Sequence, residues 1–322
     1  MSSMNFEQLL LYYRVRTVNN CKKMQQPTTT SLRAYAKINF GLHILRKRTD
    51  GYHDIETIFH RINIFDIVTV KRIDTERITI ECTHPEIPKD NTNLCYKAAD
   101  LFYSEIGHNK ELRIIVEKNI PVGAGLGGGS SDAAAVLRAC NMLYGYPLDD
   151  TALGRLSSRI GSDVPYFLQS GSAYATGRGE ILDYFDLELP YWIVLVYPRI
   201  HIETKWAYQS YTPNRNVKDI DLKSLVRENI TRPRSWVNTL RNDFEPVVFH
   251  EYPVVMRVKE ALIKGGADFA LMSGSGSSVF GLYQDESYAK EIAASLSASY
   301  DVWITPPFFK REPLISERKA DA

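Results

Sequence analysis

A glycine-rich stretch, PVGAGLGGGSSDAAA from Pro121 to Ala135, constrains the fold of this chain more than any other segment. It follows an alternating apolar run, residues 112–116, which predicts a β-strand. It leads into residues 132–140, whose alanine content favours a helix. Glycine permits positive φ and a close approach of the backbone to a ligand. Because a helix start presents unpaired N–H groups and the positive end of its dipole, this strand–loop–helix unit predicts an anion site.

Two common phosphate-binding motifs do not fit this stretch. No lysine follows the glycines, so the P-loop GxxxxGK[ST] is absent. A dinucleotide fold needs an acidic residue about 20 positions later, at the end of a second parallel strand. Asp149 and Asp150 lie near that distance but in a turn-like YPLDD segment. A flexible Gly/Ser linker is the other interpretation, and the regular patterns on both flanks argue against it.

Composition narrows the class of protein. The chain has 322 residues, which is enough for two domains, and 44% of them are hydrophobic. Its 39 basic and 38 acidic residues nearly cancel, which argues against a nucleic-acid partner and against a polybasic membrane surface. No apolar run approaches transmembrane length. The cysteines are scattered without a CxxC pair, as is typical of a reducing cytosol, so we expect a cytoplasmic protein.

The N-terminal residues differ from the rest of the chain. Residues 1–31 contain no secretory signal, and a short helical segment at Phe6–Tyr13 precedes a polar stretch. A transit peptide is one interpretation, and the pattern favours a poorly ordered extension instead. Further along, an apolar strand at residues 193–197 ends in Pro198 and suggests a domain boundary. We therefore expect domains at residues 32–197 and 198–310, followed by a tail at 311–322.

Polar residues interrupt two apolar segments. Lys37 and Asn39 would share one face of a strand over residues 31–44. The pattern alone favours a solvated strand face over a pair directed into a cleft. Asp163 is an isolated carboxylate directly before Val-Pro. Since a buried charge is costly unless it is paired, Asp163 is either a helix cap or a paired functional group.

Two other loops contain residues suited to ligand binding. Tyr52 and His53 follow an Asp-Gly turn, where they could pack and cap or could stack on a flat ligand. A second small-residue loop, Ser273–Ser278, separates two strand-like runs. Helical periodicity predicts helices at residues 93–103, 150–160, 249–264 and 286–299.

Five motifs together give a specific resemblance. AYAKINFGLHI, GYHDIETIF, PVGAGLGGGSSDAA, GSDVPYF and LMSGSGSSVFGLY occur in this order between about Arg33 and Ile304. The chain thus resembles the 4-diphosphocytidyl-2-C-methyl-D-erythritol kinases of the GHMP kinase superfamily. The resemblance implies an α+β, two-domain GHMP kinase fold. Its ATP-binding N-terminal domain would be ribosomal S5 domain 2-like, and its C-terminal domain would be ferredoxin-like.

The resemblance also implies a reaction. ATP would phosphorylate the 2-hydroxyl of 4-diphosphocytidyl-2-C-methyl-D-erythritol, a small-molecule substrate of the non-mevalonate isoprenoid pathway. Mg²⁺ would neutralise the triphosphate, and no residue is assigned as its ligand. The protein would be a monomer or homodimer. Two alternatives remain open: another GHMP small-molecule kinase, of the mevalonate or homoserine type, and a non-catalytic nucleotide-binding protein.

The resemblance assigns residues by position. The catalytic pair would be Lys37 and Asp163. The segment wrapping the ATP phosphates would comprise Pro121, Val122, Gly123, Ala124, Gly125, Leu126, Gly127, Gly128, Gly129, Ser130 and Ser131. The substrate site would comprise Asn39 near the reacting hydroxyl, Tyr52, His53, Thr204 and Tyr208 around the cytosine, and Gly274, Ser275 and Gly276 near the phosphates. From the steric role of such a loop, we expect a side chain at Gly128 to occupy the space of the phosphate.

Overall fold

A long antiparallel hairpin runs through the molecule. The computed structural model describes residues 28–212, 221–237 and 239–310, so the helix predicted at Phe6–Tyr13 lies outside the described residues. The hairpin consists of β1 (Thr29–Lys47) and β2 (His53–Arg72), paired along almost their whole length. Register shifts interrupt the pairing near Lys37, near Leu42 and near Arg46. Because each irregularity changes which face a side chain lies on, the simple alternation assumed from the sequence does not hold along β1.

The first sheet is built around β2. Its other strands are β3 (Ile78–Cys82), β4 (Leu112–Glu117), β5 (Ser172–Thr176) and β6 (Ile181–Phe185). The order is β3-β4-β2-β5-β6, with β1 also paired to β2. β3 and β4 run parallel, and the remaining neighbours are antiparallel.

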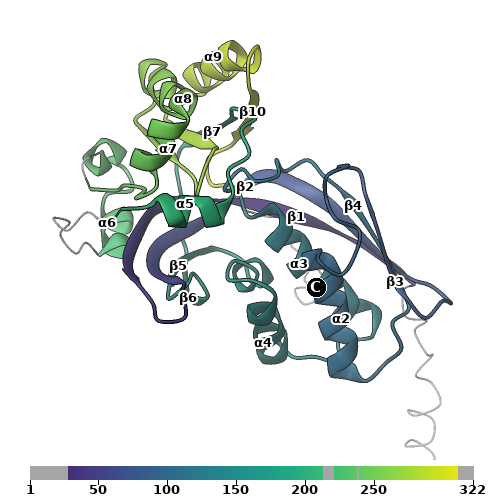
Figure 1. Ribbon diagram of the computed structural model, residues 1–322. Helices are drawn as coiled ribbons and strands as arrows, with labels where there is room; N and C mark the ends of the chain where they lie inside the picture. Colours follow the sequence, from purple (N-terminus) through teal and green to yellow (C-terminus); the bar gives the residue numbers. More distant parts are fainter. Residues whose placement is uncertain (1–27, 213–220, 238, 311–322) are drawn as a thin grey trace, which may run out of the picture.

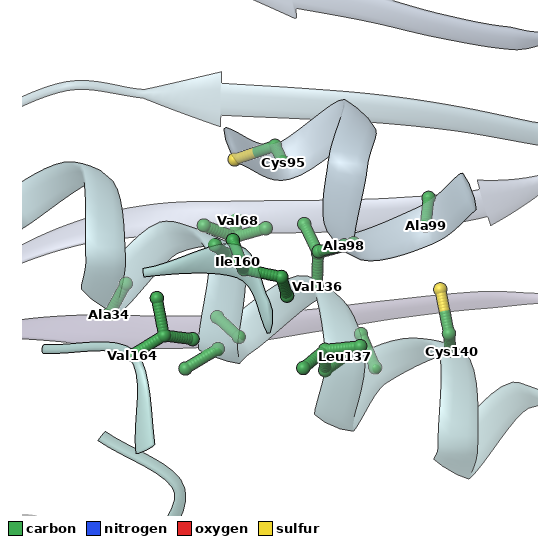
Figure 2. Packing of buried hydrophobic residues seen from close by; sticks show 14 of the residues in the cluster. Ala34, Val68, Cys95, Ala98, Ala99, Val136, Leu137, Cys140, Ile160 and Val164 are labelled. Atoms are coloured by element: carbon green, nitrogen blue, oxygen red, sulfur yellow. The ribbon is translucent and has the colours of Figure 1, made fainter. Parts of the chain in front are cut away.

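Three helices accompany this sheet: α2 (Leu94–Ile106), α3 (Gly128–Leu143) and α4 (Asp150–Ile160). Figure 2 shows the small side chains of Ala98 and Ala99 on α2, which belong to the same apolar cluster as Val136 and Leu137 of α3 and Val68 of β2. Alanines let two helices approach closely, so α3 is fixed from both sides. Truncating Leu137 to alanine in this packed core should cost about 2–5 kcal/mol. A rigid α3 matters because the glycine-rich loop leads directly into it.

The second sheet has the ferredoxin-like arrangement expected for the C-terminal part. Its strands are β7 (Trp192–Tyr197), β8 (Phe269–Met272), β9 (Val279–Tyr283) and β10 (Asp301–Thr305), in the order β10-β7-β9-β8. Helices α8 (Pro253–Lys264) and α9 (Glu286–Ser297) connect them in a β-α-β-β-α-β sequence. Figure 1 shows this unit above the hairpin, with α2, α3 and α4 below it. The expected α+β architecture, with a ferredoxin-like unit in the C-terminal part, is thus confirmed.

Two boundaries differ from the sequence expectation. The division expected after Tyr197 would leave β7 in the first domain, whereas β7 pairs with β9 and β10 of the second sheet. An apolar strand ending in proline gave no information about its partners. The single helix expected over residues 249–264 is two helices, α7 (Glu245–Glu251) and α8. Pro253 lacks an N–H and restricts the residue before it, so the first helix ends at that point.

The two sheets share a core. Alternate residues of β7 point to opposite faces: Ile193 and Leu195 join apolar residues of β1 and β2, while Val194 and Val196 pack with α8 and α9. The remaining short elements are η1 (Pro165–Leu168), α5 (Thr204–Ser210), α6 (Leu222–Glu228) and η2 (Pro233–Trp236). None of the helices in the described part of the chain combines the length and apolarity that a membrane crossing requires.

Candidate active site

A cleft of about 920 Å³ collects the predicted residues from segments far apart in the sequence. It is lined by the catalytic candidates Lys37 and Asp163 and by the glycine-rich segment from Pro121 to Ser130. The predicted substrate residues along it are Asn39, Tyr52, His53, Thr204, Tyr208, Gly274 and Ser275. Two predicted residues, Ser131 and Gly276, do not line the cleft. The roles of all these residues remain predictions.

The glycine-rich loop takes a shape that other residues resist. Gly125 and Gly127 have φ of 77° and 71°, in the left-handed region. A Cβ at Gly125 would lie 2.1 Å from the carbonyl oxygen of Ser273, and one at Gly127 would lie 3.2 Å from Cε of Lys37. The loop is therefore pressed between β1 and the loop after β8. The 16-residue helix α3 starts immediately afterwards, so its first N–H groups border the cleft and suit a phosphate.

Two expectations about this loop need correction. A Cβ at Gly128 would meet Cγ2 of Ile120 at 3.0 Å and Nζ of Lys118 at 3.2 Å, so the steric obstacle there is protein. Gly128 is already the first residue of α3. The hydroxyl of Ser131 donates to the carbonyl of Tyr35 at 2.8 Å, so it braces the helix against β1. The spacing of small residues could not distinguish cleft-facing positions from core-facing ones.

Lys37 and Asp163 form an ion pair inside the cleft, with 3.5 Å between Nζ and Oδ2. The ammonium also donates to Oδ1 of Asn39 at 2.6 Å and to the carbonyl of Gly125 at 3.3 Å. Three N–H donors thus meet three oxygen acceptors. Burial lowers the pKa of Lys37, and the nearby Asp163 opposes that shift. The side chain of Asp163 is 31% exposed, so one end of the pair is open to a ligand.

Asn39 and Thr57 form a buried chain of hydrogen bonds that continues from Lys37. The amide of Asn39 donates to the Thr57 hydroxyl at 2.8 Å, and that hydroxyl donates to the carbonyl of Gly41 at 2.5 Å. Lys37 is 4% exposed and Asn39 is 1% exposed. The solvated-face interpretation of these two residues is therefore wrong. Lys37 also lies over the ring of Phe59, with 5.0 Å from Nζ to the centroid.

The aromatic residues are arranged differently from a simple pair of facing rings. His53 stacks on Tyr208, with centroids 4.9 Å apart and an angle of 13°. Phe244 meets Tyr208 edge-on at 4.9 Å. Tyr52 is 56% exposed, and the guanidinium carbon of Arg178 lies 4.8 Å from its ring centroid. The ring that stacks directly on Tyr208 is thus that of His53, while the ring of Tyr52 contacts the guanidinium of Arg178.

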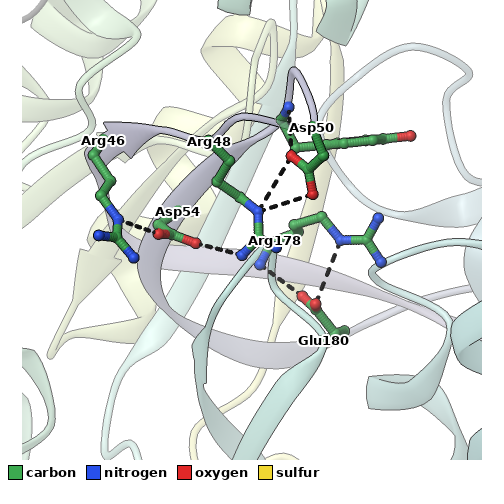
Figure 3. A network of polar contacts seen from close by, with 7 residues as sticks. Arg46, Arg48, Asp50, Asp54, Arg178 and Glu180 are labelled. Carbon is green, nitrogen blue, oxygen red and sulfur yellow. Dashed lines mark hydrogen bonds and ion pairs between the residues drawn. The ribbon is translucent and has the colours of Figure 1, made fainter.

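A network of charges holds the turn that carries Tyr52 and His53. Figure 3 shows Arg48 between Asp50 and Asp54, with N–O distances of 3.1 and 2.8 Å. The backbone N–H of Tyr52 donates to Oδ1 of Asp50 at 3.1 Å. The bond from Arg48 and the bond from this N–H both keep the turn closed. Both also lower the pKa of Asp50, and the backbone bond is the larger cause. Individual exposed pairs contribute little, and their linkage gives the turn one preferred shape.

Sequence reasoning missed a second group of cleft residues. Lys118 and Asp132 line the cleft beside the glycine-rich loop, and Lys118 is paired with both Asp132 and Asp66. Burial raises the pKa of Asp132 to about 8, against the opposing pull of Lys118. Asp132 and Asp66 lie 14 and 52 residues from Lys118 in the sequence. No local pattern therefore indicates that the three charges meet, and only the fold brings them together.

Also missed was the RNDFE segment, Arg241–Glu245. Asn242 is buried and donates to the carbonyls of Met272, at the end of β8, and of Gly274 in the loop that follows, and Phe244 lines the cleft. The sequence shows only an asparagine between two charged residues, next to a polar region without periodicity, and such a pattern does not indicate burial.

Protein ligands for a metal ion are sparse. Across residues 28–212, 221–237 and 239–310, no group of three or more His, Cys, Asp or Glu side chains is placed to hold one. Asp163 and Asp132 both line the cleft. Mg²⁺ commonly binds nucleotide phosphates with few protein ligands, so the residues present fit an ion that arrives on a triphosphate.

Comparisons with known proteins agree with this geometry. Models of the GHMP kinases N terminal domain and the GHMP kinases C terminal domain match residues 93–171 and 222–302. The 4-diphosphocytidyl-2-C-methyl-D-erythritol kinase of Prosthecochloris aestuarii is 45% identical over 87% of this chain and 98% of its own length. A crystal structure of 4-(cytidine 5'-diphospho)-2C-methyl-D-erythritol kinase superposes with a TM-score of 0.73 at 34% identity, covering 86% of this chain and 98% of that one. A homoserine kinase from Cytophaga hutchinsonii, at 19% identity and a TM-score of 0.64 over 87% of this chain and 95% of that one, shares the fold.

Proposed function

This chain belongs to the 4-diphosphocytidyl-2-C-methyl-D-erythritol kinase family of GHMP kinases, and on that premise we propose how its own residues carry out the reaction. The enzyme transfers the γ-phosphoryl group of ATP to the 2-hydroxyl of 4-diphosphocytidyl-2-C-methyl-D-erythritol, a step in the synthesis of isoprenoid precursors. The observation that carries the proposal is the Lys37–Asp163 pair, which lies in the same cleft as the glycine-rich loop and the start of α3.

ATP binds through its phosphates to the loop from Pro121 to Ser130. The left-handed glycines bring the backbone close to the ligand, and the start of α3 supplies N–H donors and a favourable dipole. Phosphoryl transfer depends mainly on position and on neutralising charge, and this loop provides both. Mg²⁺ supplies further neutralisation when it is bound to the triphosphate, and Asp163 is the open carboxylate nearest to Lys37 that could contact it.

Asp163 orients the attacking hydroxyl and accepts its proton. The ammonium of Lys37 attracts the carboxylate across 3.5 Å and holds it in place beside the cleft. As the phosphoryl group moves, the ammonium also stabilises charge on its oxygens. The hydrogen bond from Lys37 to Asn39 fixes the ammonium next to Asp163. A general base placed in this way typically contributes about 10²–10⁴-fold in rate.

The cytidyl end of the substrate binds between the turn at Tyr52 and helix α5. Tyr52 has an exposed ring suited to stacking, and His53 offers ring nitrogens to a base edge. Burial lowers the pKa of His53, which favours the neutral imidazole with one donor and one acceptor. Tyr208 and Thr204 complete the wall. Because His53 already lies on Tyr208, base binding requires His53 to move or the base to stack on its outer face.

We propose a cytoplasmic location as well, with the protein working as a monomer or homodimer. The three described cysteines, Cys82, Cys95 and Cys140, are all free thiols, which suits a reducing compartment.

An acceptor panel tests the proposed function. Purified protein is given ATP and Mg²⁺ with the cytidyl substrate, mevalonate or homoserine, and ADP release is followed. We expect release with the cytidyl substrate alone, and thermal stabilisation by CDP but not by mevalonate. Release with mevalonate or homoserine instead would support the other GHMP kinase activities, and no release with any acceptor would support a non-catalytic protein.

A further inference from the structure

The segment Arg241–Asp243 ties the two sheets together beside the cleft. The N–H of Leu42 in β1 donates to the carbonyl of Arg241, and the N–H of Asp243 donates back to the carbonyl of Leu42, both at 2.9 Å. The carboxylate of Asp243 then accepts from the N–H of Ile44 at 2.8 Å. This short segment is therefore fixed to the irregular part of β1 that also carries Lys37 and Asn39.

Asn242, at the centre of this segment, bonds to the other sheet. Its Nδ2 donates to the carbonyls of Met272 and Gly274, both at 2.8 Å, and its Oδ1 accepts from the N–H of Phe244 at 3.0 Å. The residue is 2% exposed. Both amide hydrogens and the amide oxygen are used, so the side chain has one orientation that satisfies its partners.

Asn242 holds the carbonyls of Met272, which ends β8, and of Gly274, which belongs to the small-residue loop Ser273–Ser278. That loop packs against the glycine-rich loop. The Ser273 hydroxyl donates to the carbonyl of Gly125 at 3.0 Å, and the N–H of Ser278 donates to the carbonyl of Ala124 at 3.2 Å. A Cβ at Gly274 would lie 2.8 Å from the carbonyl oxygen of Gly125. With no room between the two loops, a shift of one displaces the other.

We propose that Asn242 is a positioning residue for ATP, acting through the loop Ser273–Ser278 on the glycine-rich loop. It does not line the cleft itself. By joining β1 to the end of β8 it sets the distance between the loop that binds phosphate and the strand that carries Lys37. The inference rests on the proposed function, in which the glycine-rich loop binds the phosphates of ATP.

Asn242→Asp is the sharpest test because it keeps the shape and the Oδ1 acceptor. The second carboxylate oxygen would face the carbonyl oxygens of Met272 and Gly274, which it repels. The loop should move away and take the glycine-rich loop with it. We expect KM for ATP to rise about tenfold or more, equivalent to about 1.4 kcal/mol. KM for the cytidyl substrate should rise less than KM for ATP, since Tyr52 and His53 lie on a different turn and Oδ1 still accepts from the N–H of Phe244.

Asn141→Asp provides a matched control. Asn141 is also buried, at 4% exposed, and it likewise bridges backbone groups: Nδ2 donates to the carbonyl of Leu148 at 2.9 Å, and Oδ1 accepts from the N–H of Leu148 at 3.0 Å. It lies near the far end of α3, away from both loops. Asn141→Asp should lower the melting temperature by a similar amount and leave KM for ATP within twofold of the parent enzyme.

An unchanged KM for ATP in folded Asn242→Asp, or an equal rise in Asn141→Asp, overturns the inference. If Asn242→Asp fails to fold, the milder Asn242→Ser, which keeps one hydroxyl donor, is measured against the same limits. Calorimetry with a non-hydrolysable ATP analogue separates this inference from the proposed function. Weakened analogue binding in the variant supports the role of Asn242 even if the parent enzyme does not phosphorylate the cytidyl substrate. Unchanged binding in an enzyme that does phosphorylate it overturns the inference alone.

Discussion

The Nζ of Lys37 lies 3.5 Å from Oδ2 of Asp163, which joins the long strand β1 to the turn before η1. The lysine is enclosed while the aspartate is partly open to the cleft. A buried cation that meets three oxygens is held firmly, and a carboxylate at its open side remains available to a substrate hydroxyl. The same lysine donates to the carbonyl of Gly125, so one buried ammonium links the glycine-rich loop to Asp163.

Replacing Asp163 by asparagine should remove the base while keeping its shape. We expect kcat to fall about 10²–10⁴-fold. Binding of an ATP analogue should change less than threefold, because the loop and α3 are untouched. Asp183→Asn, at an exposed position paired with Lys223, is the control and should keep normal kcat. Near-normal kcat in Asp163→Asn would rule out the proposed role.

Lys37→Met should lower both catalysis and stability. Methionine fills a similar volume, but it removes the donor that Asp163, Asn39 and the carbonyl of Gly125 share. We expect kcat to fall at least about 100-fold. The melting temperature should fall as well, because buried acceptor oxygens lose their partner. Both quantities are measured on one preparation, and a large loss of stability with normal kcat would assign Lys37 a structural role instead.

Tyr52→Ala should raise KM for the cytidyl substrate far more than KM for ATP. Stacking on a base is worth about 1–3 kcal/mol, so the increase should be roughly 5- to 150-fold. Tyr288, which is 59% exposed in α9, is the control, because its replacement by alanine removes a comparable exposed ring. Equal changes in both KM values for Tyr52→Ala would show that the ring only holds the turn.

Acid should destabilise the fold through His60. Burial lowers the pKa of His60 to about 4, and the neighbouring charge of Arg61 acts in the same direction. Between its ordinary value of 6.5 and about 4, the unfolded chain takes up a proton that the folded protein excludes. The stabilisation is therefore present above pH 6.5 and is lost as pH falls towards 4.

The size of that effect can be measured by denaturant unfolding at pH 7 and pH 5. His60 should contribute a loss of about 2 kcal/mol between these values. His60→Asn should remove that part of the pH dependence, and the exposed His250→Asn should retain it. Burial also lowers the pKa of His43 to about 4. This histidine therefore contributes its own acid-dependent loss of stability to the parent protein and to both variants. Identical pH dependence in His60→Asn and the parent protein would contradict this explanation.

Much of the fold was predictable because local patterns carry it. The strand before the glycine-rich loop, the helix after it and the amphipathic helices α4 and α9 all follow from periodicity and composition. The partner of β7 was not predictable, because an apolar strand with both faces buried fits either sheet. Likewise, the register shifts of β1 have no sequence signature, and they lie in the strand that buries Lys37 and Asn39 in the cleft.

The candidate site was predictable where a motif places several residues at once, as in the glycine-rich loop and GSDVPYF. It was not predictable where single residues meet across long distances, as Asn242 meets Gly274 and Arg178 meets Tyr52. Motif position also could not tell that Ser131 bonds to Tyr35, since two adjacent serines at a helix start point in different directions.

The most direct measurement is ³¹P NMR of the reaction of the purified protein with ATP, Mg²⁺ and 4-diphosphocytidyl-2-C-methyl-D-erythritol. The account predicts a new phosphomonoester signal that is coupled to the substrate carbon at position 2, appears together with ADP, and forms at least about 100-fold more slowly in Asp163→Asn. Conversion of ATP to ADP with inorganic phosphate as the only other product, or a new phosphomonoester that forms equally fast in Asp163→Asn, would contradict it.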